Sequence, residues 1–118
     1  MANEARSEVG LMSRVYDKPV VIQKLSDNGE WVNQWRLLAS VNKTGGGEVH
    51  ESGARRSSHS LTFEVRYFSA LFDIFLNTQS YRIIYRGAVF NIEDYDDFME
   101  KHISVRLEGE CSGERYES

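Results

Sequence analysis

Three histidines and one cysteine are the side chains of this chain that bind transition metals most readily. His50, His59, His102 and Cys111 are separated by stretches that match no zinc motif, in which ligands come in pairs a few residues apart. A single cysteine also excludes a disulfide bond within the chain. The sequence therefore predicts no metal site and no dependence on an oxidising compartment.

Three further groups resemble catalytic or ion-binding motifs, but each lacks a required part. Ser57–His59 sets two hydroxyls beside an imidazole, yet adjacent residues in a polar loop rarely hold the geometry of a catalytic triad. Lys43–Gly47 contains the letters of a phosphate-binding loop in the wrong order. The acidic run Glu93–Glu100 lacks the glycine and the later glutamate of a calcium loop, so we interpret it as a solvated connection. We expect neither catalysis nor a bound cofactor.

Composition and charge indicate one soluble domain. A length of 118 residues fits a single domain, and 41% hydrophobic and 12% aromatic content is typical of a globular protein. We expect no contact with a membrane, because no apolar run approaches the roughly 20 residues of a membrane-spanning helix. The formal net charge of -4 provides no general attraction to phosphate backbones and argues against non-specific nucleic-acid binding.

Apolar residues recur with a period of two along most of the chain, which is typical of strands with one buried face. Glycine-rich or polar turns separate these segments. The expected strands cover residues 20–23, 31–41, 61–67, 81–85, 88–92 and 103–107. We therefore predict a mainly β protein, a small antiparallel β-barrel or sandwich of about six strands.

Two features of these elements have alternative interpretations. The nearly continuous apolar run 68–76 fits either a short helix that plugs one end of a barrel or a buried connection, because periodicity does not separate the two. Trp31 and Trp35 could face the core or a neighbouring molecule, and the general tendency of tryptophan to be buried favours the core.

The segment Ser80–Ile92 predicts a β-hairpin, with its turn at Arg86-Gly87. Alternating residues precede and follow this pair, and glycine adopts the positive φ that a tight turn needs. The residues that characterise this hairpin are Tyr85, Arg86, Gly87, Phe90 and Ile92.

A long polar segment, residues 42–59, contains almost nothing that a core could bury. Loops of this length inside a compact domain are usually functional or disordered, so we expect a functional loop here. Its candidate functional residues are Lys43, Thr44, Gly45, Gly46, Gly47, Glu48, Arg55 and Arg56. The expected organisation is an N-terminal arm (1–17), a β-barrel domain (18–110) with this loop inserted, and a C-terminal tail (111–118).

Several of these blocks, taken in order, resemble the tailed-bacteriophage head-tail joining family, whose members are also called head-closure or stopper proteins. The resemblance rests on the strand at 20–23, the two tryptophans after the glycine turn, the segments 39–41 and 63–67, and the hairpin at 82–92. The hairpin is the strongest of these blocks. Together they span roughly residues 18 to 110.

The resemblance implies a structural protein without catalysis or cofactor. It implies a small β-barrel that assembles into a twelve-membered homo-oligomeric ring beneath the portal and adaptor proteins and forms the docking surface for the tail. It also implies that the loop 42–59 projects into the channel and helps to retain packaged double-stranded DNA. The protein would belong to the neck of the virion and would assemble in the host cytoplasm.

Two alternatives remain at the level of sequence. A tail-terminator or tail-completion protein is also a small β-rich ring former, and strands do not reveal a position in the virion. Alternatively, Arg55, Arg56 and the aromatic strands could form an OB-like nucleic-acid-binding barrel, in which bases stack on aromatic rings and arginines contact phosphates.

Overall fold

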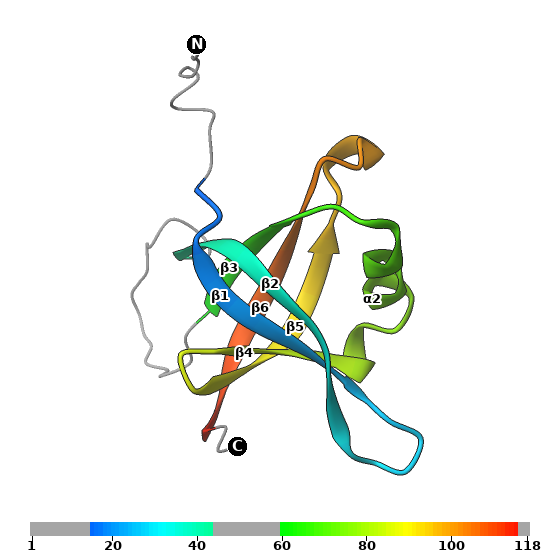
Figure 1. Cartoon of the computed structure of the whole chain (residues 1–118), viewed down its shortest axis with the longest axis vertical. Coiled ribbons are helices and arrows are strands. Elements are labelled where there is room, and N and C mark those ends of the chain that lie inside the picture. The colour runs from blue at the N-terminus through cyan, green and yellow to red at the C-terminus, as the bar shows by residue number, and fades with distance from the viewer. Residues whose placement is uncertain (1–14, 44–59, 116–118) are drawn as a thin grey trace, which may run out of the picture.

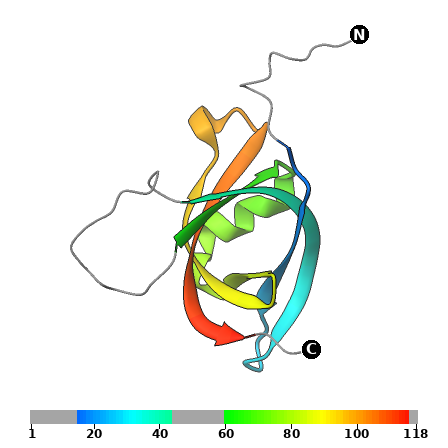
Figure 2. The ribbon, with the colours of Figure 1, turned by 90° about the vertical axis from the view of Figure 1, so that its left-hand side faces the viewer.

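A computed structural model describes residues 15–43 and 60–115 of the chain, and its strands form a closed antiparallel barrel (Figures 1 and 2). The order of strands around the barrel is β1-β2-β3-β6-β5-β4, and β4 pairs with β1 to close it. The strands are β1 (Lys18–Leu25), β2 (Trp31–Lys43), β3 (Ser60–Arg66), β4 (Tyr81–Tyr85), β5 (Ala88–Asp96) and β6 (Ser104–Arg115). The mainly β prediction is confirmed, and the barrel is the correct one of its two alternatives.

The interior of the barrel is filled by the apolar residues that alternate along each strand. Phe63 lies at its centre, fully buried, with its ring edge-on to Tyr85 and Phe90 at centroid distances of 5.5 and 5.3 Å. Full burial of one such side chain contributes about 1.5–3 kcal/mol. The buried cluster consists of Val20, Ile22, Ala39, Phe63, Val65, Leu71, Ile74, Tyr81, Ile83, Phe90, Ile92, Val105 and Leu107.

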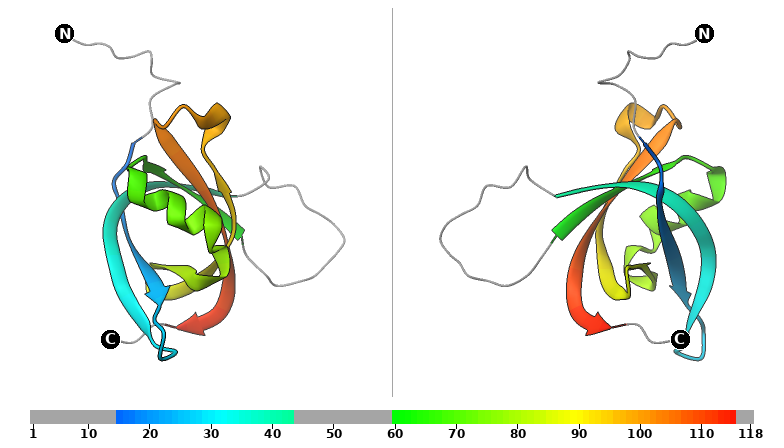
Figure 3. Two further views of the ribbon diagram at one scale, coloured as in Figure 1. Left: turned by 90° about the vertical axis from the view of Figure 1, so that its right-hand side faces the viewer. Right: turned by 60° about the vertical axis from the view of Figure 1, so that its left-hand side comes forward.

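The apolar run 68–76 forms a short helix, which decides between the two interpretations of this segment. A 3-10 turn, η2 (Ser69–Leu71), leads into α2 (Phe72–Leu76), and η3 (Thr78–Ser80) connects the helix to β4. Figure 3 shows α2 lying across one face of the barrel. Leu71 and Ile74 are fully buried against the barrel, whereas Phe72, Phe75 and Leu76 are exposed.

The hairpin predicted at Ser80–Ile92 is confirmed as β4 and β5. Arg86 and Gly87 both have positive φ, 54° and 79°, and the flanking residues Tyr85 and Ala88 are paired. A two-residue turn with positive φ at both positions matches the right-handed twist of the strands that it joins. The side chains of Tyr85, Phe90 and Ile92 belong to the barrel interior or pack against it.

Four strands are longer than the sequence predicted, and the first of them, β1, covers Lys18–Leu25 instead of residues 20–23. β2 continues through Lys43, where the loop was expected to have begun at residue 42, because Lys43 pairs with Leu61 of β3. β5 includes residues 93–96 of the expected acidic connection, and β6 runs to Arg115 through the start of the expected tail at residue 111. Pairing between β5 and β6 supplies the hydrogen bonds that extend both strands.

The alternation in β3 predicts that Glu64 is solvent-exposed, but the structure buries it to 6% exposure. The Tyr16 hydroxyl donates a hydrogen bond of 2.8 Å to one carboxylate oxygen of Glu64, and Arg106 Nε lies 3.5 Å from the other. The guanidinium of Arg66 lies over the Tyr16 ring at 4.6 Å. A buried carboxylate needs such partners, and here they attach Tyr16, which precedes β1, to the outside of β3.

The two tryptophans occupy different environments, so the prediction that both lie in the core is correct only for one. Trp35 packs against the buried cluster, stacked on Tyr81 at 5.8 Å and edge-on to Phe68 at 5.3 Å. Trp31 lies on the outer surface beneath the guanidinium of Arg82, at 4.4 Å from it.

Gly109 of β6 faces the interior and leaves room for two core rings. A Cβ at this position would lie 3.1 Å from Phe90 Cβ and 3.2 Å from Phe63 Cε1.

Gly109→Val should therefore destabilise the fold by about 1–3 kcal/mol through overpacking. Urea denaturation measures this loss, with Glu108→Val, on the outer face of the same strand, as the matched control. Equal stability of the two variants would contradict this account of the core.

Candidate functional site: an aromatic groove beside helix α2

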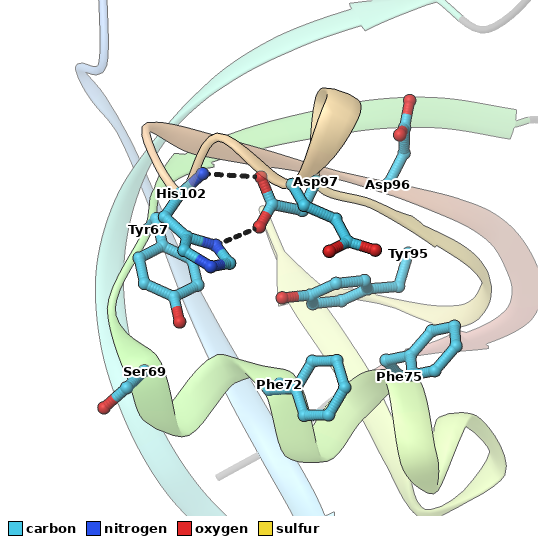
Figure 4. A pocket seen from close by; sticks show the side chains of 9 residues that line it. Tyr67, Ser69, Phe72, Phe75, Tyr95, Asp96, Asp97 and His102 are labelled. Atoms are coloured by element: carbon cyan, nitrogen blue, oxygen red, sulfur yellow. Dashed lines mark hydrogen bonds and ion pairs between the residues drawn. The ribbon is translucent and has the colours of Figure 1, made fainter.

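A groove of about 600 Å³ lies between α2 and the connection from β5 to β6 (Figure 4). This connection contains the short turn η4 (Phe98–Glu100). We call the groove between α2 and this connection the aromatic groove. Its lining residues are Tyr67, Ser69, Phe72, Phe75, Tyr95, Asp96, Asp97, Glu100 and His102. Residues from the segment that follows β3, from η2 and α2, from β5 and from the connection meet here only because the barrel brings those segments together.

The apolar part of the groove is formed by three rings. Phe72 and Phe75 stack on each other at a centroid distance of 5.2 Å, and Tyr95 contacts both at 6.3 and 5.9 Å. Phe72 is 47% exposed and Phe75 is 54% exposed, although burial of large apolar side chains stabilises a folded protein. A cluster of exposed aromatic rings next to polar groups is typical of a surface that binds another molecule.

The hydroxyl of Tyr95 is buried and has no hydrogen-bond partner among the described residues. Burial, followed by the negative charge of Asp97 and the neighbouring Tyr67, raises the pKa of this phenol from 10.0 to about 12. In Figure 4 the hydroxyl points toward the part of the groove that contains Tyr67 and His102. It is a neutral donor whose hydrogen bond the described residues do not satisfy.

A hydrogen-bonded pair holds the far wall of the groove in place. Asp97 accepts a hydrogen bond of 3.0 Å from the backbone N–H of His102, and its second oxygen lies 2.6 Å from His102 Nδ1. The imidazole stacks on Tyr67 at 4.5 Å. Three residues of this connection have backbone φ values between 51° and 59°, which residues other than glycine rarely adopt. The residues with these values are Met99, Glu100 and His102.

The rim of the groove is acidic. Asp96 and Glu100 line the groove and form no ion pair with a described residue, although Asp96 is the cross-strand neighbour of Arg106 in β6. The groove therefore combines an apolar floor with unpaired negative charge. This combination suits a partner that presents apolar side chains together with lysine or arginine.

The site contains part of a hydrolytic arrangement but not all of it. Asp97 orients His102 as in a catalytic triad, and Ser69 lines the same groove. In Figure 4, however, the Ser69 side chain points away from the imidazole, and the two form no hydrogen bond. Within residues 15–43 and 60–115, no three His, Cys, Asp or Glu side chains gather where they could hold a metal ion.

The residues selected from the sequence lie elsewhere. Lys43 ends β2, while Thr44, Gly45–Gly47, Glu48, Arg55 and Arg56 fall outside the described residues. The hairpin residues build the barrel wall and its turn and do not line the aromatic groove. Sequence reasoning therefore selected none of the groove residues as functional.

One signal in the sequence could have indicated the groove. Leu71 and Ile74 are three residues apart, and so are Phe72 and Phe75, so two adjacent faces of one short helix are apolar. A helix on the surface of a barrel can bury only one of these faces against it. The second pair was available for contact with another molecule.

This fold and this groove define a class: a small closed β-barrel with exposed aromatic side chains in a groove on its surface. The comparison with protein families identifies the family of the chain. The chain matches the phage head completion protein family over residues 15–106, and it belongs to that family. The search of curated proteins found no match for the chain. Within the described residues, no helix is long and apolar enough to cross a membrane.

Tyr95→Phe should leave the isolated protein as stable at pH 7 as the parent or more stable, by up to about 1 kcal/mol, because the lost hydroxyl has no described partner. Tyr81→Phe is the control. It removes a hydrogen bond of 2.5 Å to Asp73 and should cost about 1–2 kcal/mol. Urea denaturation of both variants tests this, and a loss above about 1 kcal/mol for Tyr95→Phe would indicate a partner for its hydroxyl.

The pH dependence of stability provides a second test of the Tyr95 environment. The folded state keeps the phenolic proton up to a pKa of about 12, whereas the unfolded chain releases it near 10.0. The free energy of unfolding should therefore fall as the pH rises from 10 to 12, because the unfolded state then binds fewer protons. Tyr95→Phe should show a smaller fall over the same range; an identical fall would contradict the assignment.

Proposed function

We propose that the protein is a head-closure, or stopper, subunit that forms a ring at the head–tail interface, docks the tail and helps to retain packaged DNA. The observation that carries this proposal is the family match, which spans residues 15–106 and therefore includes the whole aromatic groove. The family is one of structural proteins that complete the phage head. Its members interact with other head and tail proteins of the virion.

The loop is the segment that we assign to DNA retention. Residues 44–59 connect Lys43, the last residue of β2, to Ser60, the first residue of β3, and Lys43 pairs with the neighbouring Leu61. The barrel thus holds both ends of the segment at one place. In a ring, many copies of a weakly binding segment converge on one axis and act multivalently, while Gly45–Gly47 permit rearrangement when DNA passes.

The charge of the outer barrel surface supports this proposal over an OB-like nucleic-acid-binding barrel. Asp94 of β5 is paired directly with Glu108 of β6, and Glu110 follows on the same face. Such a surface repels a phosphate backbone, whereas nucleic-acid-binding barrels present basic residues around their aromatic rings. Arg106 of β6 is a cation next to these carboxylates, and it forms an ion pair with Glu64 of β3.

Disruption of the gene in its phage tests the proposed function. Electron microscopy of the lysate should show separate tails beside tailless heads, many of them without DNA, and supply of the gene in trans should restore whole particles. Complete infectious particles without the gene would refute the proposal. Filled, stable heads beside tails of abnormal length would instead assign the protein to tail termination.

Deletion of Gly45–Gly47 tests the assignment of DNA retention to the loop. Because the shortened segment reaches less far from its anchors at Lys43 and Ser60, tailless heads that contain it should lose DNA faster than parental heads. Replacement of the same residues by three serines preserves the length and is the control. DNA content of purified heads measures the effect, and equal retention in both variants would refute the assignment.

A further inference from the structure

A second surface of the barrel has the opposite charge. The outer faces of β1, β2 and β4 form a shallow groove of about 400 Å³, in which apolar side chains lie between two arginines. Register explains this composition, because Val21 pairs with both Arg36 and Ile84, and Pro19 pairs with Leu38. We call it the basic patch and define it as Pro19, Val21, Arg36, Leu38, Ile84 and Arg86.

The apolar centre of the basic patch is exposed in part. Leu38 is 56% exposed, in the middle of a strand whose neighbouring residue Ala39 is fully buried. This surface therefore repeats the property of the aromatic groove, where Phe72 and Phe75 are about half exposed. Both surfaces leave apolar area in water that a contact would bury.

The charges of the two surfaces are complementary, and the part of the chain that the structure describes forms no ion pair with them. Arg36 and Arg86 form no ion pair with any described residue. Asp96 and Glu100 at the rim of the aromatic groove likewise form no ion pair with a described residue, although Arg106 of β6 is the cross-strand neighbour of Asp96. Each surface thus presents an apolar centre flanked by charge of one sign, and the signs are opposite.

The two surfaces lie on different sides of the molecule. Figure 1 shows α2 on the right of the barrel, whereas the start of β1 and the turn between β4 and β5 lie on the left. Two complementary patches on different sides of one chain permit a head-to-tail contact, in which each copy uses one patch toward each neighbour. Such contacts close into a ring when the rotation between copies divides a full turn.

We propose that the aromatic groove of one copy binds the basic patch of the next copy. Leu38 of the second copy then covers Phe72 and Phe75, while Arg36 and Arg86 face Asp96 and Glu100. This inference rests on the ring in the proposed function and specifies the surfaces that form it.

Cysteine cross-linking tests the pairing of the two surfaces. In a Cys111→Ser background, Leu38→Cys and Phe75→Cys are combined in one chain, and concentrated purified protein and complemented phage particles are oxidised. A head-to-tail contact should give a covalent ladder of dimers, trimers and longer products. Each single-cysteine variant should give no ladder. Dimers from Phe75→Cys alone would indicate contact between identical faces and would overturn the proposal, as would the absence of any ladder from the double variant.

Charge reversal provides a measurement that does not depend on the cysteines. Arg36→Glu should weaken self-association at least tenfold, and adding Asp96→Arg should restore most of it. Lys43→Glu makes the same charge change outside both surfaces and is the control. Analytical ultracentrifugation measures the association, and thermal unfolding verifies that each variant folds. Failure of the second substitution to restore association would overturn the pairing.

The outcomes separate this inference from the proposed function. Particles that need the protein for head closure but give no cross-link would refute the interface and leave the function intact. A cross-linked ladder from a protein whose gene is dispensable for head closure would refute the function and leave the interface intact. Cross-linking of the groove cysteine to a different virion protein would assign the groove to that partner and overturn the proposal.

Discussion

Closure of the barrel is the constraint on which the other features depend. Two seams achieve it, between β1 and β4 and between β3 and β6, and both join segments far apart in the sequence. Phe63 of β3 pairs with Leu107 of β6 and fills the centre, and Gly109 gives its ring the space to do so. A closed barrel satisfies its strand hydrogen bonds internally and leaves recognition to side chains on its outer surface and to its connections.

The aromatic groove illustrates this division between scaffold and function. The barrel fixes the positions of β3, β5 and β6, and the connections that leave these strands build the groove. Leu71 and Ile74 attach α2 to the core, which turns Phe72 and Phe75 outward. The Asp97–His102 pair holds the opposite connection in a conformation with several positive φ values. Interactions that belong to the fold thus position both sides of the groove.

The chain belongs to the phage head completion family, and this membership bears on the role of the two surfaces. A protein that joins large assemblies needs binding surfaces more than it needs a catalytic centre, and exposed aromatic and charged groups are suited to that task. The aromatic groove and the basic patch both contain apolar area and charged groups that form no ion pair among the described residues. Their complementarity agrees with the proposed ring, in which one chain provides both sides of every contact.

The sequence by itself determined the local elements. Alternation at 61–67 and 81–92 predicted strands, Arg86-Gly87 predicted the hairpin turn, and the ordered blocks indicated the family. These features depend on residues close together in the chain, where periodicity and turn chemistry are legible.

Only the tertiary structure decided the remainder. It determined that the sheet closes, that Glu64 is buried beside Tyr16, and that Phe72 and Phe75 face solvent near Tyr95. The physical reason is that burial and charge pairing depend on neighbours distant in sequence. The same apolar or acidic side chain can therefore serve the core or a binding surface, and its pattern along the chain is identical in both cases.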